Sequence, residues 1–387
     1  MNPNTSRSIG EAWDQLDEPV DRVIEAVPGG TLRSMKIAFV ILGMMIFSSC
    51  SGTSIMTAES AAAYSPPNRS VCDRVLQLPR GFLCAIRPSR IDPSARDSFG
   101  GKESDAGFGY HVVAFPNREI NPQHVHVHLA GSGGRPFDQN QNASPLGKRF
   151  GARTFLEESF TSGFIVIQPA YHNRYPINSA DECQGNPGVD NCAGRVREEK
   201  ILGTDRSNVV DVPLADSIAQ RLIQIVSYLK NNGFEFPVEF TTDSSVDWTK
   251  LNVGGHSQGS GHALYIGKTF GAHHVCIIGG IHDVPDSIPP VPVRNVADWL
   301  IDPSFAMSKT QIKGFLTQED ENYAQFSRTL NFLGIHFSEV SSPPYANWDN
   351  SPLTDHGGSI GDPRFSAQRA AACFHSSYGS GGIATVK

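Results

Sequence analysis

The chain has 387 residues, 39% of them apolar, which is enough to bury the core of one large α/β domain or of two ordinary domains. Its formal net charge is −7, with acidic and basic residues interleaved along the sequence. Because no basic run is present that could follow a phosphate backbone, the composition argues against a nucleic acid as partner.

A short apolar stretch lies near the N-terminus at residues 37–47, directly after Arg33 and Lys36. It is too short to span a bilayer comfortably. A basic segment, a short apolar segment and small residues in that order are typical of an export signal, which we predict over residues 35–50. The polar and acidic residues 1–34 do not fit such a signal. We interpret them as a disordered or non-native upstream extension, since a start at Met35 is the ordinary one.

The export signal ends on Ser48-Ser49-Cys50, which resembles the lipobox of bacterial lipoproteins, where the cysteine receives the lipid. Phe47 stands where that motif usually has leucine, so ordinary cleavage near residues 61–63 stays an alternative. The resemblance implies a protein of the cell envelope that contacts the membrane only through a lipid on Cys50. The alternative implies a secreted protein.

Six further cysteines form an even set, as expected in an oxidising compartment. Short separations favour the pairs Cys72–Cys84 and Cys183–Cys192, which leaves Cys276–Cys373 as a long-range connection to the last helix. Because Cys276 lies within an apolar run, a buried free thiol is the alternative for it.

Residues 65–109 are rich in Pro, Arg, Ser and Gly with little periodicity, and over residues 51–109 we expect a tether and an irregular hairpin closed by a disulfide. Regular structure is expected from residue 110 onward. The patterns predict strands at residues 111–115, 124–129, 163–168, 251–254, 275–279, 312–316 and 337–340, and helices at 216–230, 260–270, 323–333 and 364–374. This alternation predicts one α/β domain over residues 110–387, with a mostly parallel sheet and helices on both of its faces.

The pentapeptide Gly255-His256-Ser257-Gln258-Gly259 lies between a predicted strand and a predicted helix. That context is the one a G-x-S-x-G nucleophile elbow requires, because a tight strand-to-helix turn lifts the serine hydroxyl above the edge of the sheet. The chain from about residue 110 to its C-terminus thereby resembles the α/β-hydrolase superfamily. The pentapeptide is similar to the elbow of many carboxylesterases, thioesterases and polyester-cleaving members.

This resemblance implies Ser257 as the nucleophile, followed along the chain by an acid and then a histidine. Asp320 is the first choice for the acid because it follows the predicted strand 312–316 after a short turn. Glu319 and Glu321 are its rivals, and Asp283 is an alternative one strand earlier.

The histidine is expected in the loop after the predicted strand 337–340, where the segment Asp355-His356-Gly357-Gly358 occurs. We therefore predict His356 as the general base, which exchanges a proton with Ser257 while the carboxylate orients its ring. His375, near the end of the last predicted helix, is the alternative.

An acyl-transfer site also needs backbone donors for an oxyanion. The amide of Gln258, directly after the nucleophile, is the first expected donor. A glycine-rich loop follows the predicted strand 124–129 and resembles the oxyanion loop of the family in position, so the second donor is expected at the amide of Ser132 or Gly133.

Three histidines compete with this interpretation. His124, His126 and His128 alternate along one strand and so share a face, a geometry that could bind zinc in a metal-dependent hydrolase. The later sequence supplies no matching set of ligands, and the alternative role of these rings is structural. A third reading is a catalytically inactive hydrolase fold that serves as a surface binding protein.

Residues 171–208 contain Cys183 and Cys192, several aromatic residues and no periodicity. We expect a disulfide-closed insertion that forms a lid or wall over the site and influences substrate choice, or else an inert surface loop. The sequence as a whole therefore predicts a serine hydrolase of small or polymeric carboxylic esters, with water as second substrate and no metal or organic cofactor.

Overall fold

The computed structural model describes residues 64–97, 109–134, 153–179, 181–186, 188–281, 283, 297–341 and 355–374. These residues belong to one compact unit. The predicted extension, export signal and lipidation site at Cys50 lie outside the described residues, as does His375. No helix in the described ranges combines the length and apolar character needed to cross a membrane.

Within the described ranges, a single sheet of nine strands, in the order β1-β2-β3-β5-β4-β6-β7-β8-β9, forms the centre of the unit. The strands are β1 (Arg74–Leu78), β2 (Gly81–Ile86), β3 (His111–Pro116), β4 (His124–Leu129), β5 (Phe164–Gln168), β6 (Asn252–His256), β7 (His274–Ile278), β8 (Ile312–Thr317) and β9 (His336–Val340). The pairs β1–β2, β2–β3 and β3–β5 are antiparallel. All pairs from β5 through β9 are parallel.

The N-terminal hairpin is regular and belongs to the sheet, which corrects the expectation of an irregular segment before residue 110. Strand β2 pairs along its whole length with β3, and each of its six residues is buried. Its run Gly81-Phe82-Leu83-Cys84-Ala85-Ile86 does not alternate between polar and apolar residues, because both faces of the strand are covered. Because every residue of such a strand is buried, its sequence lacks the alternation of apolar and polar residues by which strands are recognised.

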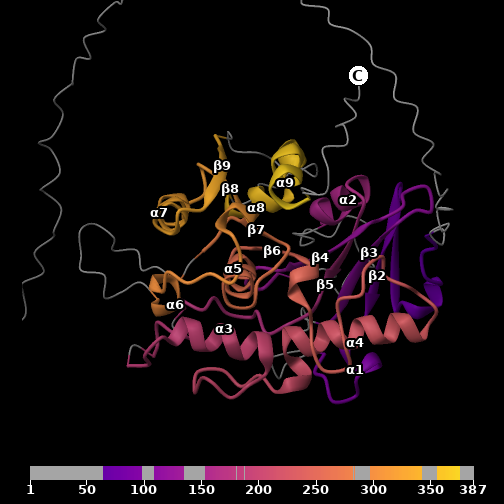
Figure 1. Cartoon of the computed structure of the whole chain (residues 1–387), viewed down its shortest axis with the longest axis horizontal. Coiled ribbons are helices and arrows are strands. Elements are labelled where there is room, and N and C mark those ends of the chain that lie inside the picture. The colour runs from indigo at the N-terminus through magenta and orange to yellow at the C-terminus, as the bar shows by residue number, and fades with distance from the viewer. Residues whose placement is uncertain are drawn as a thin grey trace, which may run out of the picture. The chain divides into compact units, whose positions relative to one another are not determined.

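Helices cover both faces of the sheet (Figure 1). On one face lie α4 (Ile218–Asn231), α5 (Gln258–Phe270) and α7 (Tyr323–Leu333), and on the other lie α2 (Arg153–Thr161), α8 (Asp355–Gly361) and α9 (Ser366–Cys373). Shorter or peripheral helices are α1 (Pro88–Ile91), α3 (Cys192–Leu202) and α6 (Asp298–Ile301). Strand β5 shows the two-sided packing: Ile165 contributes to the core on the α4 face, and Val166 to the core on the α2 face.

A mostly parallel sheet of this order, with an antiparallel edge and helices on both faces, is the α/β-hydrolase fold, so the predicted fold class is confirmed. Strand β4 lies between β5 and β6 in the sheet. The strand that follows β4 in the sequence is therefore added on one side of it, and the next strand, β6, is added on the opposite side. Open α/β sheets bind ligands beyond the carboxyl ends of their strands at such a reversal. The topology therefore predicts a ligand site at the loops that follow β4 and β6.

The described part of the chain contains three disulfides, and they join the pairs expected from the sequence: Cys72–Cys84, Cys183–Cys192 and Cys276–Cys373. The first connects the chain just before β1 to β2. The third connects β7 to the last residue of α9, and so ties that helix to the centre of the sheet.

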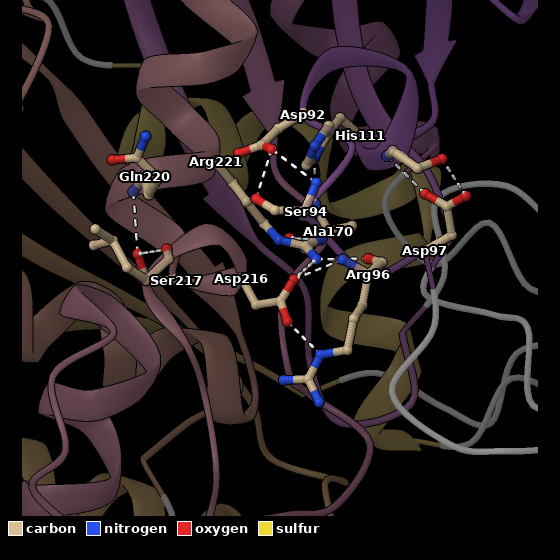
Figure 2. Close-up of polar contacts among 12 residues, drawn as sticks. Asp92, Ser94, Arg96, Asp97, His111, Ala170, Asp216, Ser217, Gln220 and Arg221 are labelled. Carbon is tan, nitrogen blue, oxygen red and sulfur yellow. Dashed lines mark hydrogen bonds and ion pairs between the residues drawn. The ribbon is translucent and has the colours of Figure 1, made fainter.

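A buried group of charges joins the N-terminal segment to the start of α4 (Figure 2). The helix begins after Ser217, whose side chain accepts a hydrogen bond from the Gln220 amide. Next to this cap, the fully buried carboxylate of Asp216 accepts from the backbone amide of Arg96 at 2.8 Å and from the Arg221 guanidinium at 2.7 Å. Arg221 also donates to the carbonyl of Ala170, two residues after β5, 3.0 Å away.

Burial opposes ionisation of Asp216, but the hydrogen bonds from Arg96 and Arg221 outweigh it, and the pKa of Asp216 is lowered. We expect Asp216→Asn to lower the free energy of unfolding by about 3–5 kcal/mol, because it leaves the buried charge of Arg221 uncompensated. The matched control Asp211→Asn, at an exposed carboxyl five residues earlier, should change it by about 0.5 kcal/mol or less. Urea denaturation at neutral pH measures both, and equal effects would contradict a structural role for this network.

Candidate active site

The residues predicted to carry chemistry follow strands whose carboxyl ends meet at one edge of the sheet. Ser257 directly follows β6, and Asp320 follows β8. His356 comes after β9, in the first turn of α8. The glycine-rich segment at residues 130–134 follows β4, which pairs with β6 through Leu129 and Gly255. The parallel register therefore assembles residues that are up to 226 positions apart, from residue 130 to residue 356, at one place.

Ser257 has a backbone conformation that residues other than glycine rarely adopt, with φ 54° and ψ −122°. Its amide donates to the carbonyl of Ile278 at 2.9 Å, and its carbonyl accepts from the amide of Ser260 at 3.0 Å. The hydroxyl of Ser260 in turn contacts the carbonyls of Gly255 and Ile278, at 2.7 and 2.8 Å. These bonds to β6 and β7 fix the turn in its strained form.

The two glycines of the pentapeptide are required by close backbone contacts. A Cβ atom on Gly259 would lie 2.0 Å from the carbonyl oxygen of Leu129 in β4. A Cβ atom on Gly255 would lie 2.3 Å from the carbonyl carbon of Gly259. Only glycine at both positions lets α5 start this close to the strand, which is the physical reason for the G-x-S-x-G spacing.

The structure brings His356 and Asp320 together: His356 Nδ1 lies 2.7 Å from Asp320 Oδ2. Asp320 is buried, and its other oxygen accepts from the Asn322 amide at 2.9 Å. Burial opposes ionisation of this carboxyl, but its hydrogen bonds with His356 and Asn322 outweigh burial and lower the pKa of Asp320. The carboxylate accepts the proton of Nδ1, which leaves the lone pair of a neutral His356 ring on Nε2.

The other candidate carboxylates do not contact His356. Glu319 accepts a hydrogen bond from Ser341 at 2.8 Å, and Glu321 is exposed. Asp283, expected as an alternative acid, is instead the partner of Arg197: Arg197 Nε lies 2.6 Å from its Oδ2, which also accepts from Trp299 at 2.8 Å. Because both side chains of this ion pair are almost completely buried, Asp283 has a structural position, and its assignment as acid is corrected.

The two loops expected to supply oxyanion donors lie against each other. A Cβ atom on Gly131 would lie 3.0 Å from the Cβ of Ser257. Gln258 is the first residue of α5, where a backbone amide has no partner within the helix. The Gly133 amide donates to the Asn173 carbonyl at 2.8 Å, so it is not available to an oxyanion, and the expectation for Gly133 is corrected. The amide of Ser132 has no partner among the described residues.

The side chain of Gln258 links these loops to the insertion at residues 171–208. One of its amide atoms lies 3.0 Å from Lys200 Nζ, and the other lies 2.8 Å from the carbonyl of Tyr175 and 2.6 Å from Ser132 Oγ. Because an ammonium only donates and a carbonyl only accepts, the amide oxygen faces Lys200 and the amide nitrogen donates to Tyr175 and Ser132. The two residues expected as oxyanion donors are thus joined through their side chains.

The insertion contains the eleven-residue helix α3, which corrects the expectation of a segment without regular structure. Its buried positions include Arg197 and Lys200, so no apolar stripe marks the helix in the sequence. Arg197 donates to the carbonyl of Gln258 at 3.2 Å, and Lys200 pairs with the buried carboxylate of Glu182 at 2.7 Å. The helix therefore lies against the start of α5, and only tertiary contacts reveal it.

The competing histidines of β4 are part of an aromatic core. The His128 ring lies 4.5 Å from that of Phe155, and the His126 ring lies 5.6 Å from that of Phe374. The described ranges contain no group of three His, Cys, Asp or Glu side chains arranged to hold a metal ion. His126 and His128 therefore pack against Phe155 of α2 and Phe374 directly after α9, and this packing corrects the metal-site alternative for these two rings.

Neither a family model nor a curated protein sequence matches the chain. Solved structures to which it is similar include an S-formylglutathione hydrolase from Agrobacterium tumefaciens, 12% identical, which spans 75% of this chain and 99% of its own with a TM-score of 0.38. A feruloyl esterase module from Clostridium thermocellum is 13% identical and spans 80% and 96%, with a TM-score of 0.34. A thermophilic carboxylesterase cloned from a metagenomic library is 11% identical and spans 77% and 90%, with a TM-score of 0.37.

Burial of His128 makes the stability of the folded protein depend on pH. Burial lowers the pKa of His128 from 6.5 to about 3, so between these values the unfolded chain binds a proton that the folded chain does not. Stability is therefore expected to fall as the pH decreases from 6.5 towards 3. His128→Leu should reduce this slope by about 1.4 kcal/mol per pH unit, which urea denaturation between pH 4 and 6 measures. An unchanged slope would mean that the ring titrates normally in the folded protein.

Proposed function

We propose that the chain is a serine hydrolase that cleaves carboxylic esters through an acyl-enzyme on Ser257. The contact between His356 and Asp320, at the sheet edge where the strained turn presents Ser257, is the observation that carries this proposal. A strained serine at the start of a helix has no evident packing role, and backbone strain of this kind is retained where function needs it. The three residues also occur in the chain order of an α/β-hydrolase triad.

In the proposed reaction, Nε2 of His356 accepts the proton of Ser257 as Oγ attacks the ester carbonyl carbon. Asp320 keeps the ring in the tautomer that can accept this proton and stabilises the resulting imidazolium. The C–O bond to the alcohol then breaks, and His356 returns the proton to the leaving alkoxide. Water repeats these steps on the acyl-enzyme and releases the acid and Ser257.

In this proposal, the backbone amides of Gln258 and Ser132 donate hydrogen bonds to the negatively charged oxygen of the tetrahedral intermediate. Backbone donors in such positions are each worth about 10²–10³ in rate. Gln258 and Ser132 support this role because their side chains are joined to each other and to Lys200, which limits movement of either loop. The proposed chemistry uses only these protein groups and water.

The three disulfides support a location outside the cytoplasm. With the predicted export signal, we propose that the enzyme acts in the cell envelope or as a secreted protein on small or polymeric esters. The wall formed by α3, closed by Cys183–Cys192, is the proposed boundary of the substrate site.

Replacement of the acid tests the triad directly. Asp320→Asn should lower kcat for a short-chain ester by about 10⁴, because an amide that donates to His356 Nδ1 favours the wrong tautomer. The matched control Glu319→Gln removes a neighbouring carboxylate that contacts Ser341, and should leave kcat close to that of the wild type. Steady-state kinetics on both variants measures this, and a loss confined to Glu319→Gln would contradict the assignment.

Covalent labelling tests the nucleophile. The protein from Cys50 onward, treated with a fluorophosphonate probe, should be labelled in the wild type and after treatment with a chelator, but not in Ser257→Ala. Absence of labelling in folded wild-type protein, or ester turnover that a chelator abolishes, would overturn the serine mechanism. Circular dichroism of each sample provides the control for folding.

A further inference from the structure

His256, the residue before the nucleophile, lies at the junction of the three segments that form the site. Its Nε2 atom is 3.1 Å from the backbone carbonyl oxygen of His356. Its ring lies 4.8 Å, centroid to centroid, from the ring of His356. A Cβ atom on Gly131, in the oxyanion loop, would lie only 3.1 Å from its Nδ1. One imidazole therefore contacts the segment of the base and the segment of the oxyanion donors.

The contact with His356 determines the tautomer of His256. A carbonyl oxygen can only accept a hydrogen bond, so His256 Nε2 must carry the proton and donate it. Burial, and next the charge that His356 can carry, lower the pKa of His256 to about 3. The ring is thus a neutral donor at any pH at which His356 could act as a base, and adds no positive charge beside the imidazolium that forms there.

The bond joins the nucleophile and the base by a short path. His256 is covalently attached to Ser257, and its ring binds the main chain of the residue that bears the base. The connection between His356 and Asp320, by contrast, orients the ring of the base without fixing its distance from Ser257. The hydroxyl of Ser359 also donates to the His356 carbonyl, at 3.0 Å, but it lies in α8 itself and moves with that helix.

We propose that His256 is a positioning residue, which sets the distance between Ser257 and His356 through its hydrogen bond to the His356 carbonyl. This inference rests on the proposed function, because it concerns the efficiency of the same triad. It gives a role to His256, which occupies the first x of the G-x-S-x-G motif. In the proposed reaction, the His256 side chain exchanges no proton.

The test compares His256→Gln with His256→Met in the protein from Cys50 onward. The two side chains have the same length, and the amide nitrogen of glutamine can replace Nε2 as a donor to the carbonyl, whereas methionine cannot donate. His256→Met should lower kcat by about 10²-fold with little change in KM, because displacement of a reacting group by about 1 Å costs that much. His256→Gln should recover most of the wild-type kcat.

Two further measurements separate positioning from a structural role. The rate of fluorophosphonate labelling of Ser257 should fall with kcat in His256→Met, and the shape of the pH profile of kcat/KM should stay that of the wild type. Equal kcat in the two folded variants, or a loss expressed only as a lower melting temperature, would overturn the proposal. If His256→Met does not fold, His256→Asn replaces it, because its shorter amide leaves the carbonyl without a donor.

The outcome is distinguishable from a failure of the proposed function. Ester turnover by the wild type and its loss in Ser257→Ala establish the triad independently of His256. An active wild type with an inactive Ser257→Ala, and with His256→Met as fast as His256→Gln, would leave the serine mechanism standing and reject the positioning role.

Discussion

The approach of helix α5 to strand β4 is the constraint on which the site depends. A Cβ atom on Gly259 would overlap the Leu129 carbonyl, so the helix can start where it does only because glycine occupies that position. This approach places Ser257 in its strained turn and puts the Gln258 amide at the start of the helix, where it has no partner within the helix. It also brings the loop after β4, with Gly131 and Ser132, against the serine. One close backbone contact thus arranges both the proposed nucleophile and the proposed oxyanion donors.

Buried charges then fix the surroundings of that turn. Arg197 contacts both the carbonyl of Gln258 and the carboxylate of Asp283, while Lys200 contacts Glu182 and the side chain of Gln258. Buried ion pairs contribute little net stability, but removal of one partner is costly, so such pairs specify one arrangement over its alternatives. We interpret these pairs as the reason that the insertion lies in a defined position against α5. The ion pairs of Arg197 and Lys200 therefore hold the proposed wall of the substrate site in place where it contacts α5.

Several features of the fold were accessible from local sequence patterns. Strand β4 and helix α7 match their predicted ranges, and α4, α5 and most strands differ only at their ends, because each has the apolar spacing of its own period. The three disulfide pairs also agree with the sequence, since two of them close short loops. Sequence patterns did not reveal an element where both of its faces are buried or where it buries charged side chains. Strand β2 is buried along its whole length, and α3 buries Arg197 and Lys200, so neither shows the expected alternation.

The sequence by itself determined most of the strands from residue 111 onward, their parallel arrangement and the pentapeptide around Ser257, because these depend on spacing over a few residues. The sequence has three carboxylates directly after β8, at Glu319, Asp320 and Glu321, but it does not show which of them contacts His356. Only the tertiary structure decided that Asp320 faces His356, that Asp283 pairs with Arg197, and that Gly133 donates to Asn173. The same holds for the contact of His256 with the His356 carbonyl, 100 positions along the chain. Such choices are made by the direction in which a side chain or an amide points once distant segments pack, and no local pattern encodes that direction.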